Sequence, residues 1–404
     1  MLCAEGHAGG DARAGGQRLL RTLHEGVSEE RMEAATNSVA HNPVPPMLRA
    51  MPAGPIGGSF AWRAEAFHDY DSWAMHVTSG DIAEIEAAAA ATKAAGLDIA
   101  RITREQFPLP GLAPKLANLR HRILNEMGFG YLRGLPVERW DADFRMRVYW
   151  GLSRHIGDPV PQNRNGHLIG HVIDIGTSVN DANKRITQTN AELSFHVDSC
   201  DVVGLLCLAT SMSGGESAIV SGVAVHDEMM RTRPDLCAVL YGPIPMDRRG
   251  EVPAGGKGWY EMPLFHWNRN AFTGFAPVRQ YVESVRRFED APPVTPLLSE
   301  ALDLFYELCA DPRFCLMIPF QPGDIQYIHN HVVFHARTAY VDRPPPAPKR
   351  HLMRLWLSAA DGRELPDALL AKWPVIERGR LRGGAVIAPD REWVVPLEPE
   401  TPAY

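Results

Sequence analysis

The sequence predicts a mixed α+β fold with a double-stranded β-helix, or jelly-roll, core and helices packed outside it. Short strand-like runs, such as residues 129–135, 202–210 and 217–221, are mixed with helical segments, a pattern that favours this core over a Rossmann sheet. The pair Gly214 and Gly215 is not a phosphate-binding loop, because neither G-K-[ST] nor G-x-G-x-x-G surrounds it. With 404 residues, 45% of them hydrophobic, the chain can bury a large core, so we expect one elaborated domain.

Composition divides the chain into three parts. Residues 1–55 are rich in Ala, Gly and Pro, and we interpret them as a poorly ordered N-terminal extension. The folded domain is expected over residues 56–380, followed by a C-terminal tail at residues 381–404. A first helix is predicted over residues 81–95, where Gly96 provides the stop.

The remaining elements follow from hydrophobic periodicity and from the positions of Gly and Pro. A second helix is predicted over residues 115–127 and leads into the strand at 129–135. Further strands are expected at residues 167–176, 202–210 and 217–221, and further helices at residues 223–241, 278–288 and 297–311. Residues 315–335 are interpreted as a buried strand interrupted by a Pro-Gly-Asp turn at 322–324.

Charge and cysteine content restrict the partners and the compartment. The formal net charge of −7 argues against a nucleic-acid or membrane surface as the main partner. No apolar run is long enough for a transmembrane helix, and the N-terminus lacks the continuous apolar segment of a secretory signal. The six cysteines contain no C-x-x-C pair, which indicates a reducing compartment. We therefore expect a cytoplasmic protein whose partner is a small molecule.

Two histidines and an aspartate form the most informative chemical pattern. His196 and Asp198 make a His-x-Asp pair in a strand-like run, and residues two apart on a strand point to the same side, so both can grip one ion. Two imidazoles and one carboxylate on one face of a metal leave positions open, the arrangement that non-haem Fe(II) uses to activate dioxygen. The pattern therefore requires a second histidine from a distant segment.

His335 is the best candidate for this third ligand, because it stands in the buried stretch 315–335. His329 and His331 lie at period-two positions relative to His335, so periodicity alone does not choose among the three. Asn330 could orient a substrate oxygen or satisfy buried backbone groups.

Three stretches, residues 196–222, 322–338 and 349–358, resemble the TauD/TfdA-type branch of the Fe(II)/2-oxoglutarate-dependent oxygenases. This group includes taurine dioxygenase, γ-butyrobetaine hydroxylase and clavaminate synthase. The resemblance extends over about residues 60–375.

The resemblance implies roles for individual residues. His196, Asp198 and His335 would hold Fe(II). Arg350, 15 positions after His335, would receive the distal carboxylate of 2-oxoglutarate, a task that suits the planar fork of a guanidinium. Ser217 falls where the family places a hydroxyl residue on the same carboxylate.

Substrate contacts are less specific in the resemblance. Arg354 matches a family arginine that contacts an anionic substrate group, but it could equally pair with an acid in the wall. Asn190 could reach the pocket mouth, with structural capping as the equal alternative. The family also has a long insertion that forms a lid over the pocket, and its aromatic and cationic residues suggest substrate shaping: Tyr260, His266, Trp267 and Arg269.

The activity implied is an Fe(II)/2-oxoglutarate-dependent oxygenase that uses O2 to oxidise, most simply to hydroxylate, a C–H bond of a small, carboxylate-bearing metabolite, giving succinate and CO2. Asp198 favours oxygenation, since halogenating relatives lack that carboxylate, whereas desaturation and ring formation stay open. The alternatives are a cupin-like metalloenzyme that does not use 2-oxoglutarate and a non-catalytic metabolite-binding descendant. A homo-oligomer is compatible with the resemblance.

Overall fold

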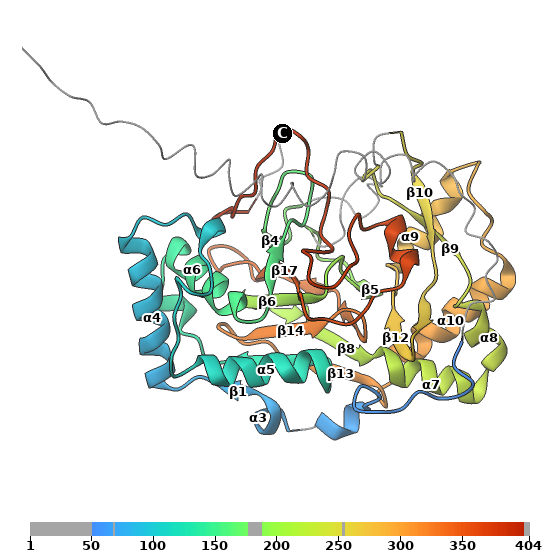
Figure 1. Cartoon of the computed structure of the whole chain (residues 1–404), viewed down its shortest axis with the longest axis horizontal. Coiled ribbons are helices and arrows are strands. Elements are labelled where there is room, and N and C mark those ends of the chain that lie inside the picture. Colours follow the sequence, from blue (N-terminus) through green and yellow to red (C-terminus); the bar gives the residue numbers. More distant parts are fainter. Residues whose placement is uncertain (1–50, 68, 177–187, 253–254, 400–404) are drawn as a thin grey trace, which may run out of the picture. The chain divides into compact units, whose positions relative to one another are not determined.

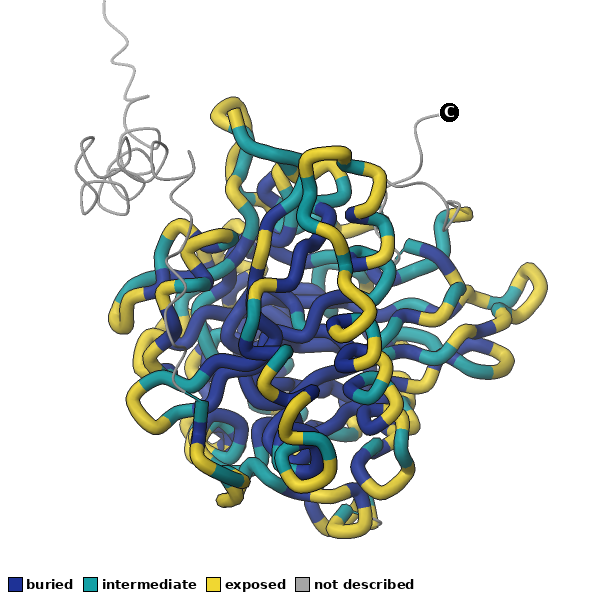
Figure 2. The backbone as a smooth tube through the Cα atoms, turned by 90° about the vertical axis from the view of Figure 1, so that its right-hand side faces the viewer, coloured by how far each residue is buried: buried dark blue, intermediate teal, exposed yellow. Residues whose placement is uncertain are grey.

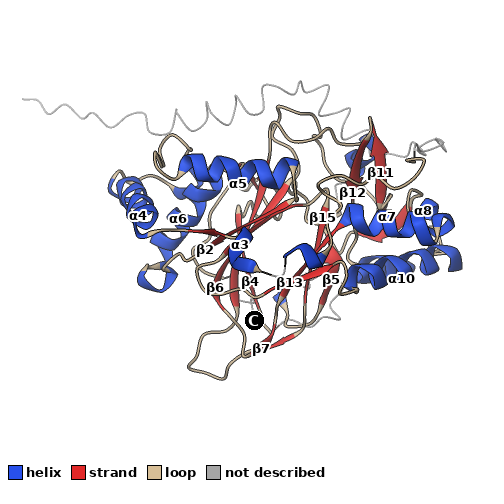
Figure 3. Ribbon diagram, turned by 90° about the horizontal axis from the view of Figure 1, so that it is seen from below, coloured by secondary structure: helices blue, strands red, loops and turns tan. Residues whose placement is uncertain are grey.

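The computed structural model describes residues 51–67, 69–176, 188–252 and 255–399. Two larger β-sheets carry helices on their outer sides, which confirms the predicted mixed class of helices and strands (Figures 1 and 3). Most of the predicted N-terminal extension lies outside the described residues.

The larger sheet has seven strands in the order β1-β2-β14-β6-β17-β3, and β4 also pairs with β17. Its pairs are antiparallel, except that β1 and β2 are parallel. The strands are β1 (Met75–His76), β2 (Phe129–Arg133), β3 (Asp158–Val160), β4 (Ile169–Ile173), β6 (Val202–Ala209), β14 (Ile325–His329) and β17 (His351–Ser358). The central strands β6 and β17 are buried along most of their length, which explains why their sequences are nearly continuously apolar.

The smaller sheet has four strands in the order β13-β8-β15-β5. They are β5 (Leu193–His196), β8 (Ser217–Ser221), β13 (Cys315–Ile318) and β15 (Val333–Arg337). Three two-stranded ribbons pair β7 (Ser213–Gly214) with β16 (Tyr340–Val341), β9 (Ile244–Asp247) with β10 (Trp259–Met262), and β11 (Phe265–Asn268) with β12 (Ala271–Gly274).

Helices pack on both sheets, and the buried residues gather in the interior of the molecule, with exposed residues around them (Figure 2). The larger sheet packs against α5 (Ala113–Asn125) and α6 (Ala142–Arg154), and α4 (Ser79–Ala94) packs on α6. The smaller sheet packs against α7 (Gly222–Thr232) and α10 (Pro296–Ala310), and α8 (Pro234–Val239) packs on those two helices. The other helices are α3 (Tyr70–Trp73) and α9 (Arg279–Ser284), with short 3₁₀ helices η1 (Ala64–Phe67), η2 (Ile99–Arg101), η3 (Val137–Arg139), η5 (Val285–Arg287) and η6 (Asp367–Ala371).

Helix boundaries follow local capping chemistry. The helix predicted over residues 81–95 is confirmed as α4, which begins with a reciprocal capping box between Thr78 and Asp81 and is followed by Gly96 in the left-handed region. The single helix predicted over residues 223–241 is wrong, because Pro234 lacks the backbone N–H that a continuing helix needs and starts a new helix instead.

The stretch 315–335 forms three strands instead of one interrupted strand. The predicted Pro-Gly-Asp turn is confirmed between β13 and β14, where Gly323 adopts a φ of 89°. A second turn follows β14, and the amide of Val332 donates to the carbonyl of His329 at 3.1 Å. This turn separates His329 from the strand of His335.

The C-terminal segment is fastened to the core. Arg382 is 1% exposed, and its Nε donates to the buried carboxylate of Asp201 at 2.9 Å. Val394 forms a parallel bridge with His167. Within the described part of the chain, no helix is long and apolar enough to cross a membrane.

We predict that Gly323→Ala destabilises the fold strongly. An added Cβ would overlap the carbonyl oxygen of Leu135, and the left-handed φ adds strain, so the free energy of unfolding should fall by about 3 kcal/mol. Gly379→Ala is the matched control, because Gly379 has a similar φ of 77° but open space around it, and should cost only about 1 kcal/mol. Urea unfolding measures both, and equal losses would contradict the steric argument.

Candidate active site

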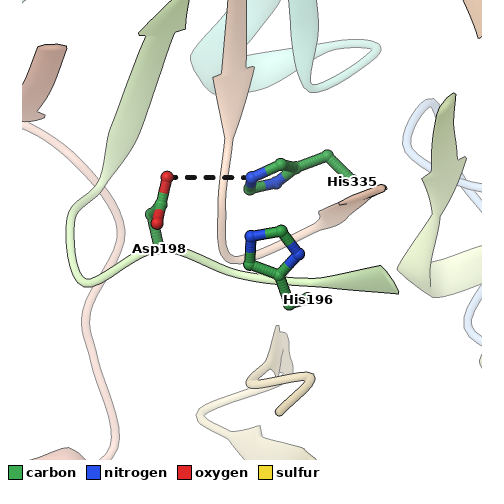
Figure 4. Close-up of side chains that lie close together, drawn as sticks. All are labelled: His196, Asp198 and His335. Atoms are coloured by element: carbon green, nitrogen blue, oxygen red, sulfur yellow. Dashed lines mark ion pairs between the residues drawn. The ribbon is translucent and has the colours of Figure 1, made fainter. Parts of the chain in front are cut away.

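Three buried side chains converge between the two sheets. The exposed fractions of His196, Asp198 and His335 are 5%, 8% and 6%, and one possible ligand atom from each lies within 4.8 Å of the others (Figure 4). Nε2 of His335 stands 3.7 Å from Oδ2 of Asp198, and the two imidazole centroids are 4.2 Å apart. This is the only such group of His, Cys, Asp and Glu found among the described residues.

Strand pairing brings the two histidines together. His196 ends β5 and lies directly opposite His335 in the antiparallel pair of β5 and β15. Asp198 follows two residues later, beyond the end of the strand. Asp198 and His335 are 137 positions apart in the sequence, and the pairing of β5 with β15 brings them together.

The hydrogen bonds and pKa values suit a metal. Nδ1 of His196 lies 2.8 Å from the carbonyl oxygen of Ser194, and because a carbonyl only accepts, Nδ1 carries the proton and Nε2 keeps its lone pair. Burial, and then His335, lower the pKa of His196 to about 3, so its ring is neutral at neutral pH. Burial opposes ionisation of Asp198, but Arg354 and the histidines hold the pKa of its carboxyl below the usual range. Neutral imidazole and ionised carboxylate are the forms that bind metal.

The two rival histidines lie elsewhere. Nε2 of His331 pairs with Asp201 at 2.9 Å, and the ring of His329 packs edge-on against Phe60. Neither lines the cavity that holds the three converging side chains. Asn330 accepts a hydrogen bond from the backbone amide of Asp198 at 3.3 Å, which is the backbone-satisfying role considered from the sequence.

Arg354 contacts the candidate metal ligand itself. Its Nη1 donates to Oδ1 of Asp198 at 3.0 Å, and its Nε donates to Oε1 of Gln162 at 2.8 Å. Gln162 in turn donates to the backbone carbonyl of Arg354 at 2.7 Å. The guanidinium is therefore held rigidly beside the triad, at the cavity wall.

Arg350 and Ser217 lie together at another part of the same cavity. Nε and Nη2 of Arg350 donate to the carbonyl of Gly215, while Nη1 is buried without a partner in the described structure. Ser217 Oγ lies 2.9 Å from Oε1 of Gln326, whose Nε2 is likewise unpartnered among the described residues. This end of the cavity therefore offers donors without acceptors.

Two residues that the sequence analysis did not select belong to this end. Arg337 lines the cavity two positions after His335, so its period-two spacing on one strand was an available signal. Gln326 stands behind Ser217 from the opposite sheet, and no sequence pattern indicates that contact.

The remaining candidates lie apart from the cavity. Asn190 is exposed, and its carbonyl accepts from the amide of Tyr340 at 3.1 Å. The aromatic and cationic residues expected in the lid do not line the cavity either: Tyr260, His266, Trp267 and Arg269. The walls that do close it are apolar, from Val172, Leu193, Leu205, Ala336 and Leu352.

The chain is similar in sequence to known proteins. FR-33289 synthase of Streptomyces rubellomurinus is 28% identical over 320 residues, which span 78% of this chain and 94% of that protein. The taurine hydroxylase-like protein SAT17 of Stachybotrys chartarum is 27% identical over 326 residues, spanning 75% and 80%.

Solved structures share the fold. An asparagine oxygenase in complex with Fe(II), hydroxyasparagine and succinate superposes with a TM-score of 0.56 at 19% identity, covering 70% of this chain and 93% of that one. The non-haem iron oxygenase OrfP, in complex with hydroxyarginine, gives a TM-score of 0.53 at 14% identity, covering 70% and 94%.

The family model for taurine catabolism dioxygenase TauD, TfdA family, matches residues 92–356, more than half of the chain. The matched range includes His196, Asp198 and His335 and the three arginines of the cavity. The chain therefore belongs to the TauD, TfdA family of dioxygenases, the 2-oxoglutarate-dependent non-haem iron oxygenases that its sequence resembles.

Proposed function

We propose that this protein oxidises, most simply by hydroxylation, a C–H bond of a small, carboxylate-bearing metabolite, with Fe(II), 2-oxoglutarate and O2 as partners and succinate and CO2 as co-products. The observation that carries the proposal is one buried cavity holding His196, Asp198 and His335 together with Arg350. The first alternative, a cupin-like enzyme without 2-oxoglutarate, does not need that arginine. The second, a non-catalytic metabolite binder, would be eliminated by any turnover of 2-oxoglutarate.

We assign Fe(II) to His196, Asp198 and His335. The donor set fits, since two neutral imidazoles and one carboxylate leave positions open on the ion. When bound, the iron supplies the dioxygen chemistry, and the chain orients the reactants and keeps water out. The apolar walls around the triad serve this second task.

We assign the distal carboxylate of 2-oxoglutarate to Arg350 and Ser217. The unpartnered Nη1 of Arg350 supports this assignment, because a buried guanidinium nitrogen needs an acceptor. The Ser217 hydroxyl can donate to the same carboxylate if the Gln326 amide turns its NH2 group toward Ser217 Oγ, which also explains the unpartnered Nε2.

Charge supports an anionic substrate. Fe(II) and 2-oxoglutarate carry opposite formal charges of equal size, so they leave the charges of the cavity side chains unbalanced. Three arginines and one ionised carboxylate line the cavity, so a substrate carboxylate would reduce the excess positive charge. Arg354, beside Asp198, is the proposed contact for that carboxylate, and the hydroxylated amino acids in the two related structures support this class.

We also propose the finer architecture and location expected from the sequence. The seven-stranded and four-stranded sheets that enclose the triad are interpreted as the two halves of a double-stranded β-helix. A cytoplasmic location is supported by the free thiols of the described cysteines, Cys200, Cys207, Cys237, Cys309 and Cys315.

Metal binding should stabilise the wild-type protein through the three assigned ligands. Fe(II), or Mn(II) as an air-stable substitute, should stabilise it by about 2.7 kcal/mol at a concentration of about 100 Kd, seen as a rise in Tm. His196→Ala should abolish the rise, whereas His329→Ala should keep it, because His329 lies outside the cavity. Loss of the rise in His329→Ala with retention in His196→Ala would contradict the assignment.

Cosubstrate binding should depend on Arg350. Anaerobic titration of the Fe(II)-loaded protein with 2-oxoglutarate should produce the weak visible charge-transfer band of the chelate, and Arg350→Met should raise the Kd roughly 10- to 100-fold. Arg343→Met removes the same charge from an exposed arginine outside the cavity and should leave the Kd unchanged. Absence of the band in folded, metal-loaded wild type would overturn the use of 2-oxoglutarate.

A further inference from the structure

A second arginine faces the cosubstrate end of the cavity, and the proposed function assigns no ligand group to it. Arg337 ends β15, two residues after His335, and therefore projects from the same face of that strand. Its side chain is 6% exposed and lines the cavity together with Arg350 and Ser217.

The hydrogen-bonding capacity of Arg337 is largely unused. Its Nη2 donates to the carbonyls of Thr189, at 2.9 Å, and Ala191. Its Nε and Nη1 are buried and have no partner in the described part of the chain. Two of the three guanidinium nitrogens of Arg337 can therefore still donate to an acceptor, and so can Nη1 of Arg350.

The charge of Arg337 is also uncompensated. Neither Arg337 nor Arg350 forms an ion pair with a described carboxylate; Asp198, the acid in the cavity, is engaged by Arg354. Instead, both guanidiniums lie over the ring of Tyr340, with their central carbons 5.0 and 5.1 Å from its centroid.

Arg337 is buried beside Arg350, and a guanidinium stays cationic at neutral pH. The two guanidiniums lie over one aromatic ring and together have three nitrogens without a partner among the described residues, so they form a binding site for an anion.

We propose that Arg337 and Arg350 together receive the distal carboxylate of 2-oxoglutarate, with Arg337 as a second cosubstrate-binding residue. This inference rests on the proposed use of 2-oxoglutarate. Each arginine is anchored on a different wall, Arg350 through the carbonyl of Gly215 and Arg337 through carbonyls of Thr189 and Ala191.

The anchoring of Arg337 has a positional consequence. The segment at residues 189–191 leads directly into β5, which ends at His196. Arg337, which would hold the carboxylate, thus donates hydrogen bonds to the segment just before β5, the strand that ends at the proposed metal ligand His196.

The test compares two 2-oxo acids on the Fe(II)-loaded protein without oxygen, so that turnover plays no part. 2-Oxoglutarate and 2-oxopentanoate share the chelating end, but 2-oxopentanoate has a methyl group in place of the distal carboxylate. The charge-transfer band reports the Kd of each for wild type, Arg337→Met, Arg337→Lys and the exposed-arginine control Arg343→Met.

Arg337→Met should raise the Kd of 2-oxoglutarate roughly 10- to 100-fold and change that of 2-oxopentanoate less than about 2-fold. Arg337→Lys should recover part of the loss, because it restores the charge without the guanidinium fork. Arg343→Met should match wild type for both acids.

Three results would overturn the proposal. An unchanged Kd for 2-oxoglutarate in Arg337→Met, or equal weakening of both acids, would mean that Arg337 only supports the wall. The same conclusion would follow if Arg337→Lys were as impaired as Arg337→Met. Absence of any band in wild type would instead overturn the proposed function itself, which separates the two failures.

Discussion

The antiparallel register of β5 and β15 is the constraint on which the site depends. It places His196 opposite His335, and the short step to Asp198 then completes a set of two imidazoles and one carboxylate. A slip of one residue would turn His335 to the other face of the sheet and scatter the set. The same strand carries Arg337 beyond His335, so one register positions both the metal side and the cosubstrate side of the cavity.

Electrostatic organisation follows from that placement. A buried carboxylate is costly unless it is paired, and Arg354 pairs with Asp198 while Gln162 holds the guanidinium in place. Among the described residues, the other cavity arginines, Arg337 and Arg350, are anchored by carbonyls and by the ring of Tyr340. The cavity thus separates a neutralised region beside the triad from a positively charged region beyond it, which suits a ligand with a negative charge at its far end.

The parts of this arrangement that depend on local chemistry could be predicted from the sequence. Gly96 marked the end of α4, and the spacing of His196 and Asp198 indicated their shared direction. Predictions that ignored a local signal failed, as at Pro234, which divides one expected helix into two. Contacts between distant elements had no local signal: the turn that removes His329 from the strand of His335 was missed, and so was Gln326 behind Ser217.

The fastening of the C-terminal segment has a consequence for chains that end early. Arg382 supplies the guanidinium that neutralises Asp201, three residues beyond Asp198, in the loop that leaves the metal strand. Without that arginine, His331 is the remaining side-chain partner of Asp201 among the described residues, and the loop loses part of its support. Chains that end before Arg382 would lack this guanidinium, and with it the ion pair that supports the loop beyond Asp198.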